Sequence, residues 1–253
     1  MNSTAAAKEL IVLPNKEKLI ATVADRFLKL LETQLRSPKD IHIVLTGGSV
    51  GIGVLAGASK RLDSVDIDWY RVHFWWGDDR WLPENDPERN DYQAAVALLD
   101  GLGLPPENIH AFPTSDSGLS LEEAASSFNA ELLRWAAEGC QYPDFSLCFL
   151  GVGPDAHIAS LFPNRSAIFS EDFVALSVAD SPKPPAERLS FSLPLINSSE
   201  RVWMVLAGSD KHAALEAALG QADPKQAPAS LVQGRNETLI FTDREASAPL
   251  SSV

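Results

Sequence analysis

One histidine in the sequence occupies a position that α/β enzymes commonly use for acid–base chemistry. His157 follows an apolar run at 145–150 and a turn that contains Gly151 and Gly153, and Asp155 precedes it by two residues. A carboxylate at this spacing can orient an imidazole, and an imidazole exchanges protons near neutral pH. We predict that His157 accepts a proton and that Asp155 assists it. The alternative is a helix-capping or core histidine.

A glycine turn after another apolar run could hold a phosphate. Gly47, Gly48 and Ser49 follow the strand-like segment 41–45 and precede a helical segment. Glycines permit a tight turn, and the N–H groups at the start of a helix attract anions. The turn lacks the GxxxxGK[ST] pattern of a nucleotide P-loop, which favours a single phosphate ester over a triphosphate. The alternative is a turn with a structural role alone.

Two other motif matches are weaker. The stretch GGSVG at 47–51 fits the GxSxG pattern of serine hydrolases, but no HGG-type oxyanion segment precedes it. The stretch GVGPDA at 151–156 fits a loose dinucleotide fingerprint. Pro163 interrupts the helix that this fingerprint requires, and no acidic residue ends the next strand-like segment at 173–178. We therefore expect neither a serine nucleophile nor nicotinamide binding.

An arginine surrounded by acidic and aromatic residues follows the strand-like segment 71–76. The loop GDDRW places Arg80 directly after Asp78 and Asp79. A guanidinium can grip a phosphate through two parallel hydrogen bonds, so we predict that Arg80 binds negative charge. We assign Asp79 to the same site, while an acidic surface loop remains the alternative for both carboxylates.

Three more cations follow later apolar segments. Lys211 lies in the first turn of a helical segment, from which its ammonium could reach an anion. Lys183 and Arg188 belong to the stretch SPKPPAERLSF, whose prolines stiffen a loop that could close over the site. We assign all three to substrate or phosphate binding, with solvated surface charges as the alternative.

The remaining titratable residues indicate neither a metal nor a cofactor. Four other histidines are scattered without the spacing of metal ligands: His42, His73, His110 and His212. Cys148 lies inside an apolar run, where a small hydrophobic side chain fits, and Cys140 is the only other cysteine. We predict no metal, no disulfide and no cofactor.

The elements that must position these residues alternate between strands and helices. Apolar runs predict strands at 9–13, 41–45, 71–76, 145–150, 173–178, 188–193, 201–207 and 238–242. Helical patterns lie between them at 15–36, 50–62, 90–99, 121–138 and 209–219. This alternation is typical of a Rossmann-like three-layer α/β fold, with a mostly parallel sheet and helices on both faces. We predict a single domain over residues 1–253.

The charge of the chain limits its partners. Thirty-four acidic and 21 basic side chains give a net charge of −13. Such a field repels nucleic acid and anionic membranes, so an anionic ligand needs a locally basic pocket. The first residues lack a secretory signal pattern, and no stretch reaches the roughly 18 apolar residues of a membrane helix. We expect a cytoplasmic protein with no nucleic-acid or membrane partner.

Five separated motifs together resemble the 6-phosphogluconolactonase family. They are LTGGSVG, FWWGDDRWLPENDPERND, LGVGPDAHIASLFPN, SPKPPAERLSFSLP and VLAGSDKHAAL, in the family's order, and the match covers roughly residues 40 to 215. The fold of this family is shared with glucosamine-6-phosphate isomerase/deaminases and ribose-5-phosphate isomerases. The resemblance implies hydrolysis of 6-phospho-D-glucono-1,5-lactone without a cofactor, by a monomer or a weak homo-oligomer.

The resemblance also implies roles for individual residues. His157 would activate the attacking water, Arg80 and Lys211 would bind or stabilise negative charge, and the turn at 47–49 would help to hold the phosphate. Two positions depart from the family pattern: Ala156 replaces a glycine, and Asp79 replaces a glutamate. If position 156 needs a positive φ, alanine there costs about 1 kcal/mol or more.

Three rival functions remain open at this point. A glucosamine-6-phosphate isomerase/deaminase would release ammonia from its substrate, although the segment HIASLFP at 157–163 favours the lactonase over the deaminase pattern GHIAFNEP. A non-catalytic sugar-phosphate sensor would bind without turnover. A serine esterase would lose its activity in a Ser49→Ala variant.

Overall fold

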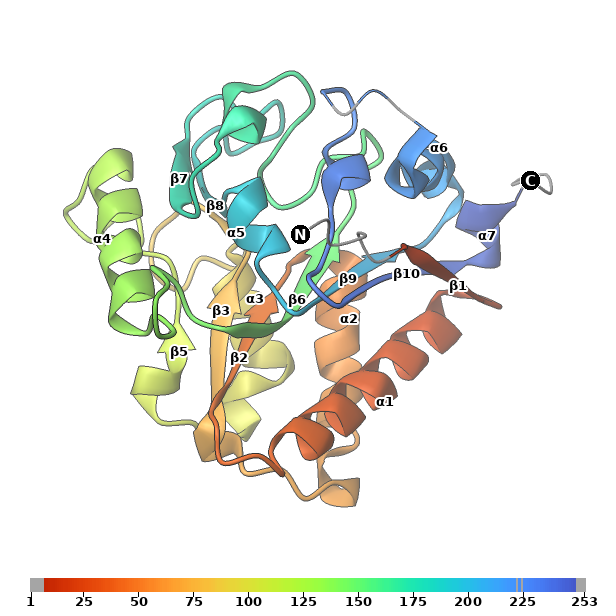
Figure 1. Ribbon diagram of the computed structural model, residues 1–253, viewed down its shortest axis with the longest axis horizontal. Coiled ribbons are helices and arrows are strands. Elements are labelled where there is room, and N and C mark those ends of the chain that lie inside the picture. Colours follow the sequence, from red (N-terminus) through yellow and green to blue (C-terminus); the bar gives the residue numbers. More distant parts are fainter. Residues whose placement is uncertain (1–6, 222, 224, 249–253) are drawn as a thin grey trace.

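A parallel sheet forms the centre of the molecule (Figure 1). The computed structural model describes residues 7–221, 223 and 225–248. Every strand pair in the sheet is parallel. Its strand order is β1 (Glu9–Leu13), β10 (Glu237–Asp243), β9 (Arg201–Leu206), β6 (Phe145–Gly151), β2 (Ile41–Leu45), β3 (Val72–Trp76) and β5 (Ile109–His110).

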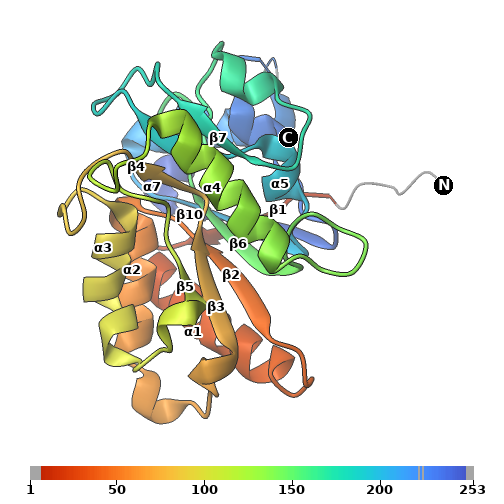
Figure 2. The same ribbon diagram turned by 90° about the vertical axis from the view of Figure 1, so that its left-hand side faces the viewer.

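Helices cover both faces of this sheet, which confirms the predicted fold class. One face carries α1 (Lys16–Gln34), α2 (Gly48–Ser59) and α3 (Asn90–Ala97), whereas α4 (Leu121–Arg134) lies on the opposite side of β2 and β3 (Figure 2). Three short helices complete the fold: α5 (Leu193–Asn197), α6 (His212–Glu216) and α7 (Arg244–Ser247). The described part of the chain contains no helix long and apolar enough to cross a membrane.

Local sequence signals explain where the long helices begin and which face they bury. The Asn15 side chain accepts a hydrogen bond from the Lys18 N–H and caps α1, whose apolar stripe, including Leu19, Val23 and Phe27, is fully buried. Ser120 and Glu123 form a reciprocal capping box at the start of α4. Such caps satisfy N–H groups that have no partner inside the helix.

A small antiparallel sheet that the sequence did not predict lies beside the main one. It pairs β4 (Asp78–Arg80) with β8 (Arg188–Phe191), and β8 with β7 (Ala175–Val178). The prediction of a loop at GDDRW, residues 77–81, is therefore wrong at Asp78–Arg80. A strand of three charged residues has no apolar alternation, and its partner lies far away in the sequence, so its pattern gave no strand signal.

Other boundaries also differ from the predictions. The predicted helix at 209–219 is a 3-10 turn (Ser209–Lys211), then α6, then a wider turn (Ala217–Gln221) in which Gly220 has a φ of 97°. The helix predicted at 121–138 ends at Arg134, and the two-residue strand β5 escaped prediction because of its length.

The order of the strands reverses between β2 and β6. From β2 the chain builds β3 and β5 on one side, and it then returns to place β6, β9 and β10 on the other. Parallel sheets leave a crevice beyond the carboxyl ends of their strands at such a reversal, and ligands bind there. The predicted site residues follow the strands that flank this point.

Three histidines, His42, His73 and His110, form a ladder of neighbouring rings near the amino-terminal ends of β2 and β3, away from this crevice. Trp75 Nε1 donates to His42 Nδ1 over 3.1 Å, and His73 Nδ1 lies 3.0 Å from His110 Nε2. His110 Nδ1 lies 3.0 Å from Glu131 Oε1, which can only accept, so His110 donates there and its Nε2 accepts from His73. Burial, reinforced by the neighbouring rings, lowers the pKa of both His42 and His110 to about 3.

The ladder predicts that stability falls in acid. Between pH 6.5 and about 3, His42 and His110 bind protons in the unfolded chain but stay neutral in the folded protein. The free energy of unfolding therefore falls as the pH falls. For His110, which is 4% exposed, we expect a loss of roughly 2 kcal/mol at pH 5. Urea denaturation at pH 7.5, 6 and 5 measures it, and His110→Gln should flatten the dependence. Parallel curves for the two proteins would contradict this account.

Candidate active site

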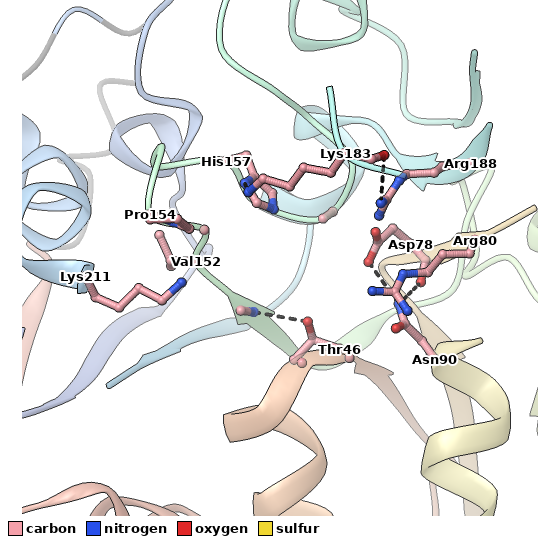
Figure 3. A pocket seen from close by; sticks show the side chains of 15 residues that line it. Thr46, Asp78, Arg80, Asn90, Val152, Pro154, His157, Lys183, Arg188 and Lys211 are labelled. Carbon is pink, nitrogen blue, oxygen red and sulfur yellow. Dashed lines mark hydrogen bonds between the residues drawn. The ribbon is translucent and has the colours of Figure 1, made fainter. Parts of the chain in front are cut away.

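Four neighbouring strands deliver side chains to one cavity of about 230 Å³ (Figure 3). The ends of β3, β2, β6 and β9 supply the segments that begin at Asp78, Thr46, Val152 and Gly208, respectively. The residues that line the cavity include Thr46, Gly47, Gly48, Asp78, Arg80, Asn90, Gly153, His157, Lys183, Arg188 and Lys211. A protein with a strongly negative net charge thus concentrates cations at one point.

His157 and Asp155 form a close pair at the end of β6. His157 Nδ1 lies 2.5 Å from Asp155 Oδ1, and the ring packs against Phe162 at a tilt of 32°, with 4.6 Å between the ring centres. Because a carboxylate only accepts, Nδ1 carries the hydrogen and Nε2 keeps a free lone pair. Burial alone would raise the pKa of Asp155, but the hydrogen bonds from His157 and Lys183 and the charge of the Lys183 ammonium outweigh it and lower that pKa.

Two arginines face each other across the small sheet. Arg80 on β4 is the direct cross-strand neighbour of Arg188 on β8, and both line the cavity. Their partners are neutral: Arg80 donates to Glu88 O, and Arg188 donates to Pro184 O and Pro185 O over 3.1 Å each. Burial lowers the pKa of Arg188, and the charge of Arg80 adds to this effect. Like charges placed opposite each other are destabilising, so the pair favours an anion between them.

Lys211 supplies a cation from the opposite side of the cavity, near Val152 (Figure 3). Its ammonium lies 3.8 Å from Asp210 Oδ2, and burial lowers its pKa. Positive charge therefore lies on both sides of the imidazole, from Arg80 and Arg188 on one side and from Lys211 on the other.

Gly47 and Gly48 are required as glycines for different structural reasons. Gly48 has a φ of 79° and begins α2, so its N–H lies at the positive end of the helix dipole. A Cβ on Gly47 would overlap the side-chain amide of Asn90, which also lines the cavity. Asn90 donates to Asp78 O over 2.8 Å and so joins α3 to β4. The sequence did not single out Asn90, although it lies within the motif FWWGDDRWLPENDPERND.

Asp78 and Asp79, which the sequence could not distinguish, have different positions in the structure. Asp78 lines the cavity, where its carboxylate accepts a hydrogen bond of 2.7 Å from Ser160. Asp79 faces away from the cavity, is 1% exposed, and accepts N–H groups of Arg80 and Asn90 over 2.8 and 2.7 Å. Burial raises the pKa of Asp79 to about 7 against the charge of Arg89. Asp79 therefore does not touch the cavity but anchors the loop that carries Arg80.

Arg89 completes this anchor, and its removal should destabilise the protein. Its guanidinium is 1% exposed, lies 3.6 Å from Asp79 and donates to Asp91 over 2.7 and 2.9 Å. Arg89→Leu leaves Asp79 buried without a counter-charge, so we expect the free energy of unfolding to fall by about 3–5 kcal/mol. Urea denaturation measures this change. The control Arg134→Leu, at an exposed position on α4, should stay within about 0.5 kcal/mol of wild type; equal losses in the two variants would refute the anchor.

Comparisons with known proteins identify the family of the chain. A family model described as "Glucosamine-6-phosphate isomerases/6-phosphogluconolactonase" matches residues 14–241. The chain belongs to this family. It is 39% identical over 246 residues to the 6-phosphogluconolactonase of Streptomyces coelicolor, covering 96% of this chain and 94% of that one. It is 38% identical over 241 residues to the Mycobacterium leprae 6-phosphogluconolactonase, covering 94% and 97%.

Solved structures of this family share the fold. The 6-phosphogluconolactonase of Thermotoga maritima superimposes with a TM-score of 0.80 at 24% identity, covering 94% of this chain and all of that one. A monomeric glucosamine-6-phosphate deaminase gives a TM-score of 0.78 at 18% identity, covering 94% and 98%. At these identities the likeness concerns the architecture alone.

Ala156, where the family resemblance implies a glycine, adopts a backbone conformation that favours glycine. Ala156 has a φ of 60°, so this position does adopt the left-handed conformation that favours glycine. The turn is held by hydrogen bonds from Ala156 N to Gly153 O over 2.9 Å and from Ala229 N to Ala156 O over 3.0 Å. Alanine costs about 1 kcal/mol there, but the contact between His157 and Asp155 forms nonetheless.

The structure does not bring Ser49 to the cavity, which Asp79 does not line either. Its hydroxyl accepts a hydrogen bond of 3.0 Å from Lys16, and the residue lines a neighbouring groove between α2 and α3. Among the residues that the structure describes, no group of three or more His, Cys, Asp or Glu side chains is arranged to hold a metal ion. Cys140 and Cys148 are both free.

Proposed function

We propose that this protein hydrolyses 6-phospho-D-glucono-1,5-lactone to 6-phosphogluconate. The observation that carries the proposal is the His157 imidazole, which is paired with Asp155 and has a free Nε2. It lies in a cavity with Arg80 and Arg188 on one side and Lys211 on the other. The family and the names of its relatives support the same substrate. The reaction needs no cofactor, and because its substrate is a phosphorylated intracellular sugar, the proposal includes a cytoplasmic location.

In the proposed mechanism, His157 Nε2 removes a proton from a water that attacks C1 of the lactone. The carbonyl oxygen becomes an oxyanion, and the ring oxygen leaves as the intermediate collapses to a carboxylic acid, which then releases its proton to solvent. The imidazolium then returns its proton to that leaving oxygen. Asp155 holds the imidazole in the tautomer that leaves Nε2 free, and cations around C1 stabilise the oxyanion.

The remote phosphate would supply binding energy rather than chemistry. We assign it to the side of the cavity where Arg80 and Arg188 face each other, with the N–H groups at the start of α2 nearby. An anion there relieves the repulsion between the two guanidinium groups. Binding energy from such a non-reacting group fixes the position of the lactone carbonyl relative to His157.

A pH-stat assay on freshly generated phosphogluconolactone tests the proposal. Hydrolysis releases acid, and since lactones also open unaided, the enzyme must exceed the spontaneous rate measured with buffer alone. Ammonia release from glucosamine 6-phosphate would instead identify a deaminase. Tight binding of 6-phosphogluconate without turnover would identify a sensor. Size-exclusion chromatography of the same sample tests the expected monomer or weak homo-oligomer.

A further inference from the structure

Lys183 touches the catalytic pair rather than only lining the cavity. Its ammonium lies 3.1 Å from Asp155 Oδ1 and 3.1 Å from His157 Nδ1 (Figure 3). From its sequence position, Lys183 was expected to bind the substrate or its phosphate. Its contacts in the structure point instead to the nitrogen on the far side of the imidazole from the reacting Nε2.

The loop that carries Lys183 is fixed by its own hydrogen bonds. Ser181 Oγ donates to Lys183 O over 2.8 Å and accepts from Lys183 N over 3.2 Å. The buried guanidinium of Arg188 donates to Lys183 O, Pro184 O and Pro185 O over 3.1 to 3.3 Å. The backbone at Lys183 is therefore held from both sides, and the ammonium has a defined place beside the imidazole.

The Lys183 ammonium and the Asp155 carboxylate cannot both form a hydrogen bond with Nδ1, because the ammonium needs an acceptor there and the carboxylate needs a donor. Asp155 takes the Nδ1 hydrogen, so Lys183 donates to Asp155 and approaches Nδ1 as a bare positive charge. A carboxylate next to an imidazole favours the protonated ring, in which Nε2 can no longer accept a proton. The Lys183 ammonium opposes that effect in two ways: it partly neutralises the charge of Asp155, and it repels the positive charge of a protonated His157.

We propose that Lys183 is a positioning residue that keeps His157 neutral and therefore able to accept a proton at working pH. The proposal rests on the proposed function of His157 as the base. Other charges face the imidazole from further away: Lys211 from the end of β9, and Asp78, Arg80 and Arg188 across the cavity. Among the described residues, Asp155 and Lys183 are the two charged groups that lie within 3.1 Å of Nδ1.

The test compares Lys183→Met with Lys183→Arg in pH–rate profiles of kcat and kcat/KM. Without the cation, Asp155 favours the imidazolium unopposed. We expect the acid limb of the profile in Lys183→Met to move upward by about one pH unit or more. Activity is then lost mainly below the new limb and recovers at higher pH. Lys183→Arg retains the charge and should keep the limb close to its wild-type position.

Lys211→Met removes a cation from the same cavity without touching Nδ1, and it serves as the matched comparison. We expect its KM to rise or its kcat to fall with the acid limb in place. If Lys183→Met behaves in the same way, Lys183 is a substrate ligand and the proposal is wrong. A uniform loss of activity at every pH, with an unshifted limb, would show a structural role and would equally overturn it.

A second readout needs no substrate. The imidazole C–H signal of His157 in an NMR pH titration, identified by its absence in His157→Gln, should move its midpoint upward in Lys183→Met and little in Lys183→Arg. This measurement tests the charge coupling even if the protein hydrolyses no lactone, so failure of the proposed function and failure of this inference are distinguishable. Superimposable titrations of wild type and Lys183→Met would reject the inference.

Discussion

Replacing His157 with alanine should lower the turnover of phosphogluconolactone by about 100-fold or more. Among the described residues, His157 is the only imidazole that lines the cavity, and its Nε2 is free because Asp155 takes Nδ1. Its side chain is 17% exposed and lies at a loop rather than in the core, so truncation leaves the fold intact. The residual rate reflects the cationic cavity, which still binds the substrate and stabilises the oxyanion.

The loss in His157→Ala should appear in kcat rather than in KM, because the ring acts on the water and not on the phosphate. The control is His212→Gln, which changes a histidine that bonds to Ala246 O on α7 and does not line the cavity. It should hydrolyse the lactone at the wild-type rate. Near wild-type turnover by His157→Ala would reject the imidazole as the base, whatever the behaviour of the control.

The second large effect is expected from a single methyl group. A Cβ on Gly153 would overlap the His157 ring and would lie 2.6 Å from Asp155 Oδ1. The φ of Gly153 is not in the left-handed region, so the backbone tolerates alanine there and the pair of side chains must move instead. Because displacing a catalytic group by about 1 Å can cost 100-fold, we expect Gly153→Ala to lose activity on the order of 100-fold.

Gly101→Ala is the matched control for Gly153→Ala, because a Cβ at that position meets nothing within 4 Å. It should leave both activity and stability unchanged. Thermal denaturation should show Gly153→Ala folded, with its melting temperature near that of the wild type. If Gly153→Ala hydrolyses the lactone as fast as Gly101→Ala does, the imidazole is not held where the structure places it.

Much of the main sheet could be predicted because its signals are local. Buried parallel strands such as β2 and β6 read as short apolar runs that end at glycines, and the residues just beyond them meet at one edge. His157, Arg80 and Lys211 could therefore be named from their positions after strands. The family motifs added the substrate, which no local pattern contains.

The parts that could not be predicted depend on pairing between distant segments. Successive residues of a strand face opposite sides, so Asp78 and Arg80 face the cavity while Asp79 faces inward. This assignment requires knowing that β4 is a strand, which its sequence conceals. In the same way, the contact of Lys183 with His157 depends on a loop held by Arg188, and no spacing in the sequence reveals it.

The histidine ladder and the cavity occupy opposite ends of the same two strands. His42 precedes Thr46 by four residues on the way along β2, which corresponds to roughly 13 Å at the usual rise of a strand. Tolerance to acid and turnover are therefore separable properties of this protein. An engineer could rebuild the ladder with apolar or amide side chains for use in acidic media and leave the reacting groups in place.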